Sequence, residues 1–180
     1  MAKIETLFDA FNGVSLNTTL WRIQTPPTPD PASTITVGAG VLTIVQASKG
    51  ITLYSQNSYD WTNSSFVIGP IDGLCHIIAS GPIQLTNDGA QVQFGEYGNP
   101  YGFVTYNATT MRYFRFRCTT TAVYAGYSTD GNTWVEFSSV ATTIPTAAAI
   151  GIEIGVNSNT TTIRGVNIIP NTGAFLPFFI

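Results

Sequence analysis

The sequence contains few charged residues. Asp, Glu, Lys and Arg make up 9% of its 180 residues, against roughly 25% in an average soluble protein. The net charge of −3 provides no basic patch of the kind that nucleic-acid binding requires, so we expect no nucleic acid among its partners. Thr, Ser, Asn and Gly take the place of the charges, which favours β-structure whose outer faces carry hydroxyl and amide groups.

Long hydrophobic runs are also missing. No apolar stretch reaches the roughly 18 residues of a membrane-spanning helix, so we expect no membrane partner. Residues 1–13 lack the continuous apolar segment of a secretory signal. We therefore expect a protein that is synthesised in a cytoplasm without a signal peptide.

Cysteine and histidine are scarce, and this limits the chemistry that the chain can perform. Cys75 and Cys118 lie in strand-like runs and are predicted to be two buried thiols, with a single disulfide as the alternative. The one histidine, His76, provides no Ser-His-Asp relay and is interpreted as a hydrogen-bonded packing residue. There is neither a Cys/His cluster nor an Asp-rich calcium loop, so we expect no metal and no cofactor.

Residues 111–137 predict three consecutive antiparallel strands. The first alternates, with Phe114, Phe116 and Cys118 on one face, and the opposite face carries Tyr113, Arg115 and Arg117. A second strand is predicted at 122–129 and a third around Trp134, Val135 and Phe137. The turn between them contains Asp130-Gly131, in which Gly accepts the positive φ of a tight hairpin. We expect the Asp130 side chain to cap this turn rather than to perform chemistry.

The rest of the chain continues this pattern of short strands and turns. Strand-like runs are predicted at 7–11, 16–24, 34–37, 41–46, 51–55, 65–71, 74–80, 90–97, 101–107, 148–157 and 161–169. Residues 26–31 contain four prolines and are predicted to form an extended surface loop. The prediction is therefore an all-β, two-sheet antiparallel β-sandwich, with residues 1–170 as a single domain.

The last ten residues, 171–180, form a separate apolar tail. It contains five large apolar residues: Phe175, Leu176, Phe178, Phe179 and Ile180. Such a tail is unfavourable in water. Two interpretations stay open, namely a segment packed over the core of its own domain and a segment that docks on a partner subunit.

Several short phrases along the chain resemble a known group. The chain opens with Phe8-Asp9-Ala10-Phe11-Asn12-Gly13 followed by Trp21, and continues with the strand Gly40-Val41-Leu42-Thr43-Ile44. The hairpin at 127–134 reads Tyr-Ser-Thr-Asp-Gly-Asn-Thr-Trp, and residues 150–156 alternate Ile with Gly. These phrases resemble bacterial and phage members of the concanavalin A-like jelly-roll domains, a group that includes legume lectins, laminin G-like modules and laminarinase-type glucanases. The resemblance implies a jelly-roll sandwich.

The same resemblance bears on catalysis. Glucanases of this fold share an E-x-D-x-x-E strand whose carboxylates act as nucleophile and acid. No E-x-D occurs in this sequence, so we expect that the protein is not an enzyme. A glycoside hydrolase is retained only because the fold permits it.

The candidate ligand-binding residues are Tyr113, Arg115 and Arg117, on the outward face of the predicted central strand. Aromatic rings can stack on sugar faces while Arg donates hydrogen bonds to sugar hydroxyls. The alternative is that these residues are ordinary solvated groups or form ion pairs with the few acidic residues.

The resemblance and the composition together predict a non-enzymatic virion structural protein of a bacteriophage, such as a capsid decoration, minor capsid or tail accessory subunit. Its expected location is the virion, and its expected partners are other virion proteins, including further copies of itself. The apolar residues 175–180 would then dock on a partner. The alternative is a carbohydrate-binding module that recognises host-surface glycans.

Overall fold

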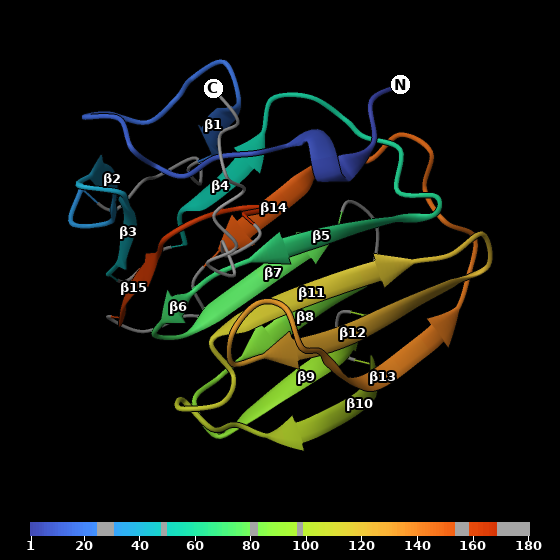
Figure 1. The fold of residues 1–180 in the computed structure, drawn as a ribbon. Helices are drawn as coiled ribbons and strands as arrows, with labels where there is room; N and C mark the ends of the chain where they lie inside the picture. The colour runs from blue at the N-terminus through green and yellow to red at the C-terminus, as the bar shows by residue number, and fades with distance from the viewer. Residues whose placement is uncertain (25–30, 48–49, 80–82, 97–98, 154–158, 169–180) are drawn as a thin grey trace, which may run out of the picture.

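The computed structural model of the chain describes residues 1–24, 31–47, 50–79, 83–96, 99–153 and 159–168. The described chain is built from β-strands, preceded by one short 3-10 helix at Ile4–Thr6 (Figure 1). The proline-rich segment predicted at 26–31, except for its last residue, lies outside the described residues. So does the tail with Phe175, Leu176, Phe178, Phe179 and Ile180. Within the described chain, no helix is long and apolar enough to cross a membrane.

The largest sheet has seven antiparallel strands. Its strand order is β1 (Trp21–Gln24), β4 (Thr52–Ser55), β14 (Ile150–Glu153), β7 (Cys75–Ala79), β8 (Ile83–Asn87), β9 (Gln91–Glu96) and β10 (Asn99–Thr105). Strands from the start, middle and end of the chain therefore lie side by side, as a jelly roll requires.

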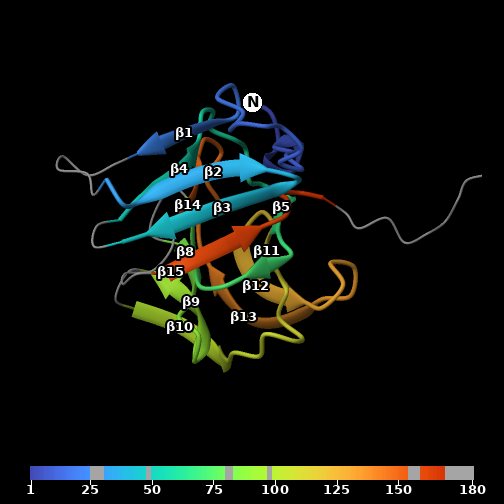
Figure 2. The ribbon, with the colours of Figure 1, turned by 90° about the vertical axis from the view of Figure 1, so that its left-hand side faces the viewer.

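Two four-stranded sheets form the rest of the fold. One has the order β13 (Val135–Ala141), β12 (Ala122–Ser128), β11 (Tyr113–Cys118) and β5 (Ser64–Ile68), and the other has the order β2 (Thr34–Gly38), β3 (Val41–Gln46), β15 (Asn159–Ile163) and β6 (Ile71–Asp72). Figure 2 shows β2, β3 and β15 side by side on one flank of the molecule. The predicted second sheet is thus divided into two sheets, with β5 in one and β6 in the other.

The core lies between the seven-stranded sheet and the other two sheets. Its aromatic centre joins the layers, since the Phe116 ring lies 6.2 Å from that of Trp61 and 6.1 Å from that of Phe94. Cys75 and Cys118 are both free thiols in this core, and burial raises the pKa of each to about 12. The prediction of two buried thiols is confirmed.

The central strand β11 has the predicted alternation. Its core side is formed by Phe114, Phe116 and Cys118, each at most 4% exposed. Tyr113, Arg115 and Arg117 are half-buried and lie on the outward face. The predicted strand at 122–129 is β12, and the third strand of the meander is β13, which begins one residue after Trp134.

The predicted strand at 7–11 is wrong. Asp9 Oδ1 accepts the backbone N–H of Phe11 at 2.7 Å, and Asp9 Oδ2 accepts the indole N–H of Trp21 at 2.8 Å. Phe11 has a φ of 51°, in the left-handed region that a strand cannot contain. A side-chain carboxylate, rather than a neighbouring strand, satisfies the amide donor here.

Candidate functional site

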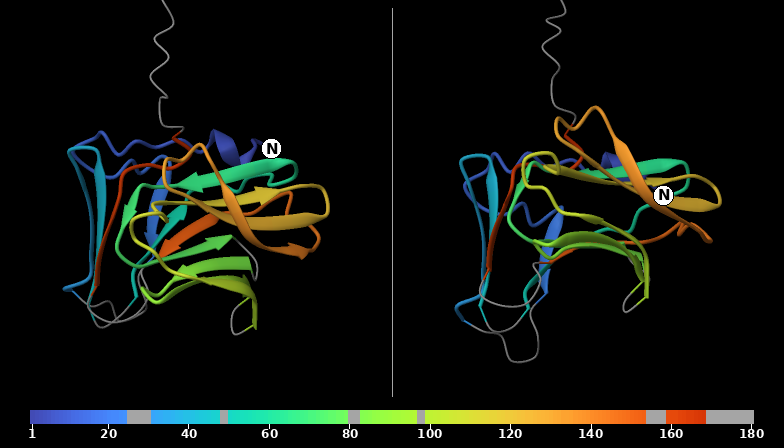
Figure 3. Two further views of the ribbon diagram at one scale, coloured as in Figure 1. Left: turned by 60° about the horizontal axis from the view of Figure 1, so that its bottom comes forward. Right: turned by 90° about the horizontal axis from the view of Figure 1, so that it is seen from below.

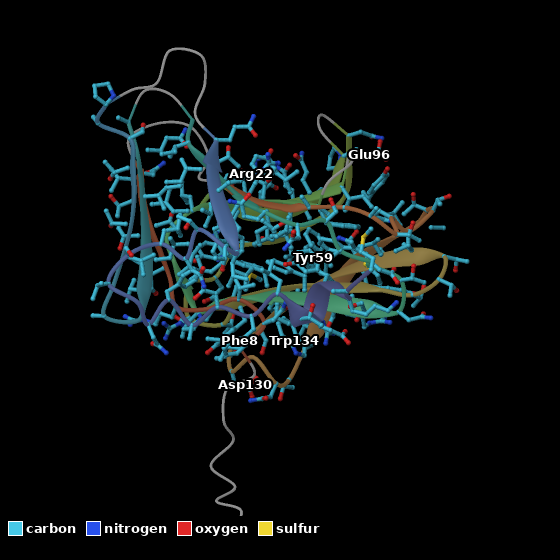
Figure 4. All side chains as sticks on the ribbon, turned by 90° about the horizontal axis from the view of Figure 1, so that it is seen from above. Phe8, Arg22, Tyr59, Glu96, Asp130 and Trp134 are labelled. Carbon is cyan, nitrogen blue, oxygen red and sulfur yellow. The ribbon has the colours of Figure 1, made fainter. Side chains whose placement is uncertain are left out.

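The outward face of the seven-stranded sheet forms the candidate site. Figure 3 shows this sheet arching away from the rest of the fold, so that its outward face lies on the inner side of the curve. Figure 4 shows Arg22, on β1, and Glu96, at the end of β9, on the same side of the molecule toward the two ends of the sheet. The face is therefore concave and spans the width of the sheet.

Alternation along three adjacent strands determines which side chains line the middle of this face. The core takes Ile77, Leu85 and Phe94, so the positions between them point outward. These half-buried outward residues are His76 and Ile78 on β7, Gln84 and Thr86 on β8, and Gln91 and Gln93 on β9. The cross-strand register places Thr86 between His76 and Gln93, and a 2.6 Å hydrogen bond joins His76 Nε2 and Gln84 Oε1.

A pocket of about 260 Å³ opens on this face toward β10. Its lining consists of Gln84, Thr86, Gln93, Gly95, Glu96, Asn99 and Pro100. The register between β9 and β10 shifts at Pro100, which is a β-bulge. Glu96 forms a hydrogen bond with Tyr101 that raises the pKa of the Tyr101 phenol. The polar groups that line the pocket are thus amides and a hydroxyl, with one carboxylate.

An aromatic ring lies on the other half of the concave face. Tyr54 on β4 is in register with Gly151 on β14. A Cβ at Gly151 would lie 2.7 Å from the nearest Tyr54 ring carbon and 3.2 Å from Cζ, so the ring lies across the glycine backbone. The Arg22 guanidinium lies 5.6 Å from the centre of this ring. Glycine is required here because any side chain would displace the ring.

On β8 and β9, in the middle of the concave face, the outward side chains Gln84, Thr86, Gln91 and Gln93 are neutral hydrogen-bonding groups. Gln84 and Gln93 can each donate and accept through one amide, and the Thr86 hydroxyl can do both as well. Among the described residues, no group of three or more His, Cys, Asp or Glu side chains is arranged to hold a metal ion. The face is suited to binding a neutral polar molecule.

The predicted binding residues lie on a different surface, the outward face of the sheet β13-β12-β11-β5. Arg115 Nη2 lies 3.1 Å from Glu136 Oε1, and Arg117 Nη2 donates to Glu136 Oε2 at 2.8 Å. In register, Gly126 separates Arg115 from Glu136, and its lack of a side chain lets the two meet across β12. Tyr113 lies at the start of β11, where burial raises its pKa.

Aromatic rings pack against Arg115 and Arg117, which together with Glu136 form the arginine cluster. The Arg115 guanidinium lies 4.4 Å from the centre of the Trp134 ring, and that of Arg117 lies 4.0 Å from the Tyr124 ring. The hydrogen bond from Arg117 lowers the pKa of Glu136, and desolvation lowers that of Arg115. The ion pairs that the sequence left open as an alternative are therefore present. A ligand role for Tyr113, Arg115 and Arg117 stays a prediction.

The prediction for Asp130 is confirmed. Its Oδ1 accepts the backbone N–H groups of Asn132 and Thr133, each at 2.8 Å, and the hydroxyl of Ser128 at 2.9 Å. These hydrogen bonds lower the pKa of Asp130 to about 2. The carboxylate therefore holds its own turn.

Sequence reasoning missed the centre of the concave face, because strand β8 is absent from the predicted strands. The signal is short but present. Residues 83–86 alternate Ile, Gln, Leu and Thr, and the Asn87-Asp88-Gly89 turn follows. Gln84 and Thr86 could have been found from this alternation. His76 forms a hydrogen bond, as expected, but it lies on the concave face rather than in the core.

No family model matches the chain, and no curated protein matches it by sequence. Solved structures do match its fold. The exoplasmic/lumenal domain of VIP36 in its Ca²⁺-bound form is 10% identical, with 89% of this chain and 87% of that chain covered and a TM-score of 0.66. The chain has the concanavalin A-like jelly-roll fold.

Two glucanases share this jelly-roll fold. A prokaryotic β-1,3-1,4-glucanase (lichenase) from a mouse hindgut metagenome is 12% identical, with 88% of this chain and 96% of that chain covered and a TM-score of 0.61. The Bacillus licheniformis β-glucanase is 14% identical, with 88% and 95% covered and a TM-score of 0.60. At these identities the likeness concerns the fold alone.

Proposed function

We propose that this protein is a carbohydrate-binding module that holds a glycan on the concave face of its seven-stranded sheet. The observation that carries the proposal is the neutral polar lining formed by Gln84, Thr86 and Gln93, on the same concave face as the ring of Tyr54, from which strands β14 and β7 separate it. Amides and hydroxyls pair with sugar hydroxyls in both directions. An exposed aromatic face offers apolar contact to the C–H groups of a sugar ring.

The proposal is for binding without hydrolysis. Glycosidases commonly place two carboxyl groups about 5 to 9.5 Å apart across the scissile bond. Glu96 is the one carboxylate in the lining of the β9–β10 pocket, and outward positions of β8 carry an amide and a hydroxyl. The described side chains that line this pocket thus include one carboxylate, whereas that mechanism needs two.

The structural neighbours support a carbohydrate ligand. The VIP36 domain is known in complex with Man3GlcNAc, and the two glucanases are named for their glucan substrates. On a bacteriophage virion, such a module would bind host-surface glycans. This joins the proposal to the virion setting predicted from the sequence.

The first experiment is a glycan array on the full chain, followed by calorimetry with the best ligand. Each of Gln84→Ala and Gln93→Ala is expected to weaken binding about 3- to 10-fold, the value of one or two hydrogen bonds. Thr36→Ala is the matched control, because Thr36 is exposed on β2, outside the seven-stranded sheet. It should leave the affinity unchanged.

Two outcomes would overturn the proposed binding site, and a third would overturn the proposal of binding without hydrolysis. One is that no glycan binds. The other is that Arg117→Ala abolishes binding while Gln84→Ala and Gln93→Ala do not, which would move the site to the arginine cluster. Release of reducing ends from the bound glycan would show that the protein is a hydrolase rather than a binding module.

A further inference from the structure

A second pocket lies on the opposite side of the molecule and is mainly apolar. Its volume is about 280 Å³, and its lining consists of Phe8, Asp9, Ala10, Phe11, Asn12, Gly13, Ser15, Asn17, Leu20 and Val37. Figure 4 shows Phe8 on the side away from Arg22 and Glu96. The pocket is therefore separate from the proposed glycan site.

Hydrogen bonds and ring packing hold the residues that line the pocket in place. The Asp9 carboxylate holds both the Phe11 backbone and the Trp21 indole, and the Phe11 ring lies 6.3 Å from that of Trp21. Leu20 and Val37 pack partly against the core. A cavity of about 150 Å³ is enough for benzene, so this pocket has room for an aromatic side chain.

Apolar surface at this pocket lacks a cover in the described part of the chain. Phe8, in the lining of the pocket, is 56% exposed. Asp9 is the one charged residue of the lining, and its carboxylate oxygens already accept two hydrogen bonds. The pocket therefore suits an uncharged apolar segment.

The described chain ends beside this pocket. Val166 donates its backbone N–H to Asp9 O at 2.9 Å, and Asp9 returns a hydrogen bond to Val166 O at 3.2 Å. The Asn167 side chain donates to Leu7 O at 2.8 Å. The end of the described chain is thus held next to Phe8 in space, by hydrogen bonds to the residues on either side of it. Residues 169–180 follow it, and they contain no charged side chain and six large apolar ones.

From these contacts we infer that residues 175–180 of this chain dock on the pocket formed by Phe8, Phe11, Leu20 and Val37 of the same chain and insert one large apolar side chain into it. The six residues 169–174 span up to about 20 Å when extended, which is ample for a segment anchored next to the pocket. Attachment to the same chain also gives the segment a high effective concentration there, which favours it over a segment from another copy.

The test uses a nitroxide label on Ile180→Cys and amide NMR of the full chain. Cys75 and Cys118 are buried, so the introduced thiol is labelled selectively. We expect selective loss of the amide signals of residues 8–13 and of Leu20. Removing residues 174–180 from the unlabelled chain should shift the same signals.

Two matched variants of the labelled chain check the pocket itself. Phe8→Lys places a charge in the lining and should abolish the signal loss. Val14→Lys makes the same kind of change at an exposed position outside the lining and should preserve it. Glycan binding should be unaffected by either, so failure of this inference leaves the proposed function standing.

Three results would overturn the inference. The first is signal loss spread evenly or centred elsewhere. The second is equal signal loss in Phe8→Lys and Val14→Lys. The third is signal loss that appears only when isotope-labelled chains without the nitroxide are mixed with nitroxide-labelled chains, because this would show docking on a second copy.

Discussion

The two outward faces of the sandwich share one structural feature but differ in the side chains that it brings together. On each face a glycine in the middle of a sheet lets a long side chain lie over the backbone. Over Gly126 the side chains of Arg115 and Glu136 meet, and their charges neutralise each other. Over Gly151 lies the ring of Tyr54, on the face that also carries the neutral amides of β8 and β9. The first arrangement stabilises the fold, whereas the second leaves hydrogen-bonding groups for a ligand.

Substituting Glu136 should produce the largest difference between the two faces in the free energy of unfolding. Glu136→Gln removes the anion shared by Arg115 and Arg117, and leaves two guanidinium groups facing each other. Because the Glu136 side chain is 30% exposed and partly screened, we expect a loss of about 1–2 kcal/mol in the free energy of unfolding. Urea denaturation measures it.

The matched control is Glu96→Gln on the concave face. Glutamine can still accept the Tyr101 hydroxyl through its carbonyl oxygen, so the free energy of unfolding should change by less than in Glu136→Gln. Equal losses in the two variants would show that the arginine cluster contributes no more to stability than an isolated carboxylate does.

Replacing arginine by lysine tests the geometry of the cluster rather than its charge. Arg115→Lys keeps the cation but removes the planar group that both contacts Glu136 and lies on Trp134. We expect a loss of about 1 kcal/mol in the free energy of unfolding. Arg22→Lys on the concave face should lose less, because its guanidinium lies 5.6 Å from the Tyr54 ring. Thermal unfolding of the pair decides whether planarity matters.

Removing a tyrosine from each face should separate stability from binding. Tyr124→Ala takes away the ring beneath Arg117, with an expected loss of about 0.5–1 kcal/mol in the free energy of unfolding and no change in glycan affinity. Tyr54→Ala is expected to weaken glycan binding about 3- to 10-fold by removing the flat apolar contact. The two faces would not be functionally distinct if Tyr124→Ala weakened binding as much as Tyr54→Ala.

Local pattern was sufficient to predict the arginine-bearing strand. The burial of Phe114 and Phe116 follows from alternation alone, since a strand with one buried face repeats every second residue. The partner of the two arginines did not follow, because Glu136 lies on β13, two strands away from β11 in the same sheet. Only the cross-strand register through Gly126 brings them together.

The concave face was harder to predict for a related physical reason. Its residues come from strands that are distant in sequence, and Tyr54 meets Gly151 across nearly a hundred residues. Neutral amides also carry no sequence signature of their own. At residues 7–11 the error was the opposite one, because a strand was predicted where none forms. Asp9 replaces strand pairing there with side-chain hydrogen bonds to Phe11 and Trp21.

The smallest of these effects on stability is expected from acid, which should destabilise the turn at Asp130 between β12 and β13. The pKa of Asp130 is about 2 in the folded protein, below its ordinary value of 3.8. The folded state therefore binds the proton less readily than the unfolded chain does. The stabilising contribution is complete above pH 3.8, and it is lost as the pH falls toward about 2.

The variant Asp130→Asn isolates this contribution. Its amide oxygen can still accept the N–H groups of Asn132 and Thr133, so the turn keeps its geometry, but the side chain no longer titrates. The urea midpoint of the natural protein should therefore fall more steeply with acid than that of the variant. Parallel curves for the two proteins would mean that the charge of Asp130 adds nothing to the turn beyond the hydrogen bonds that a neutral amide can form.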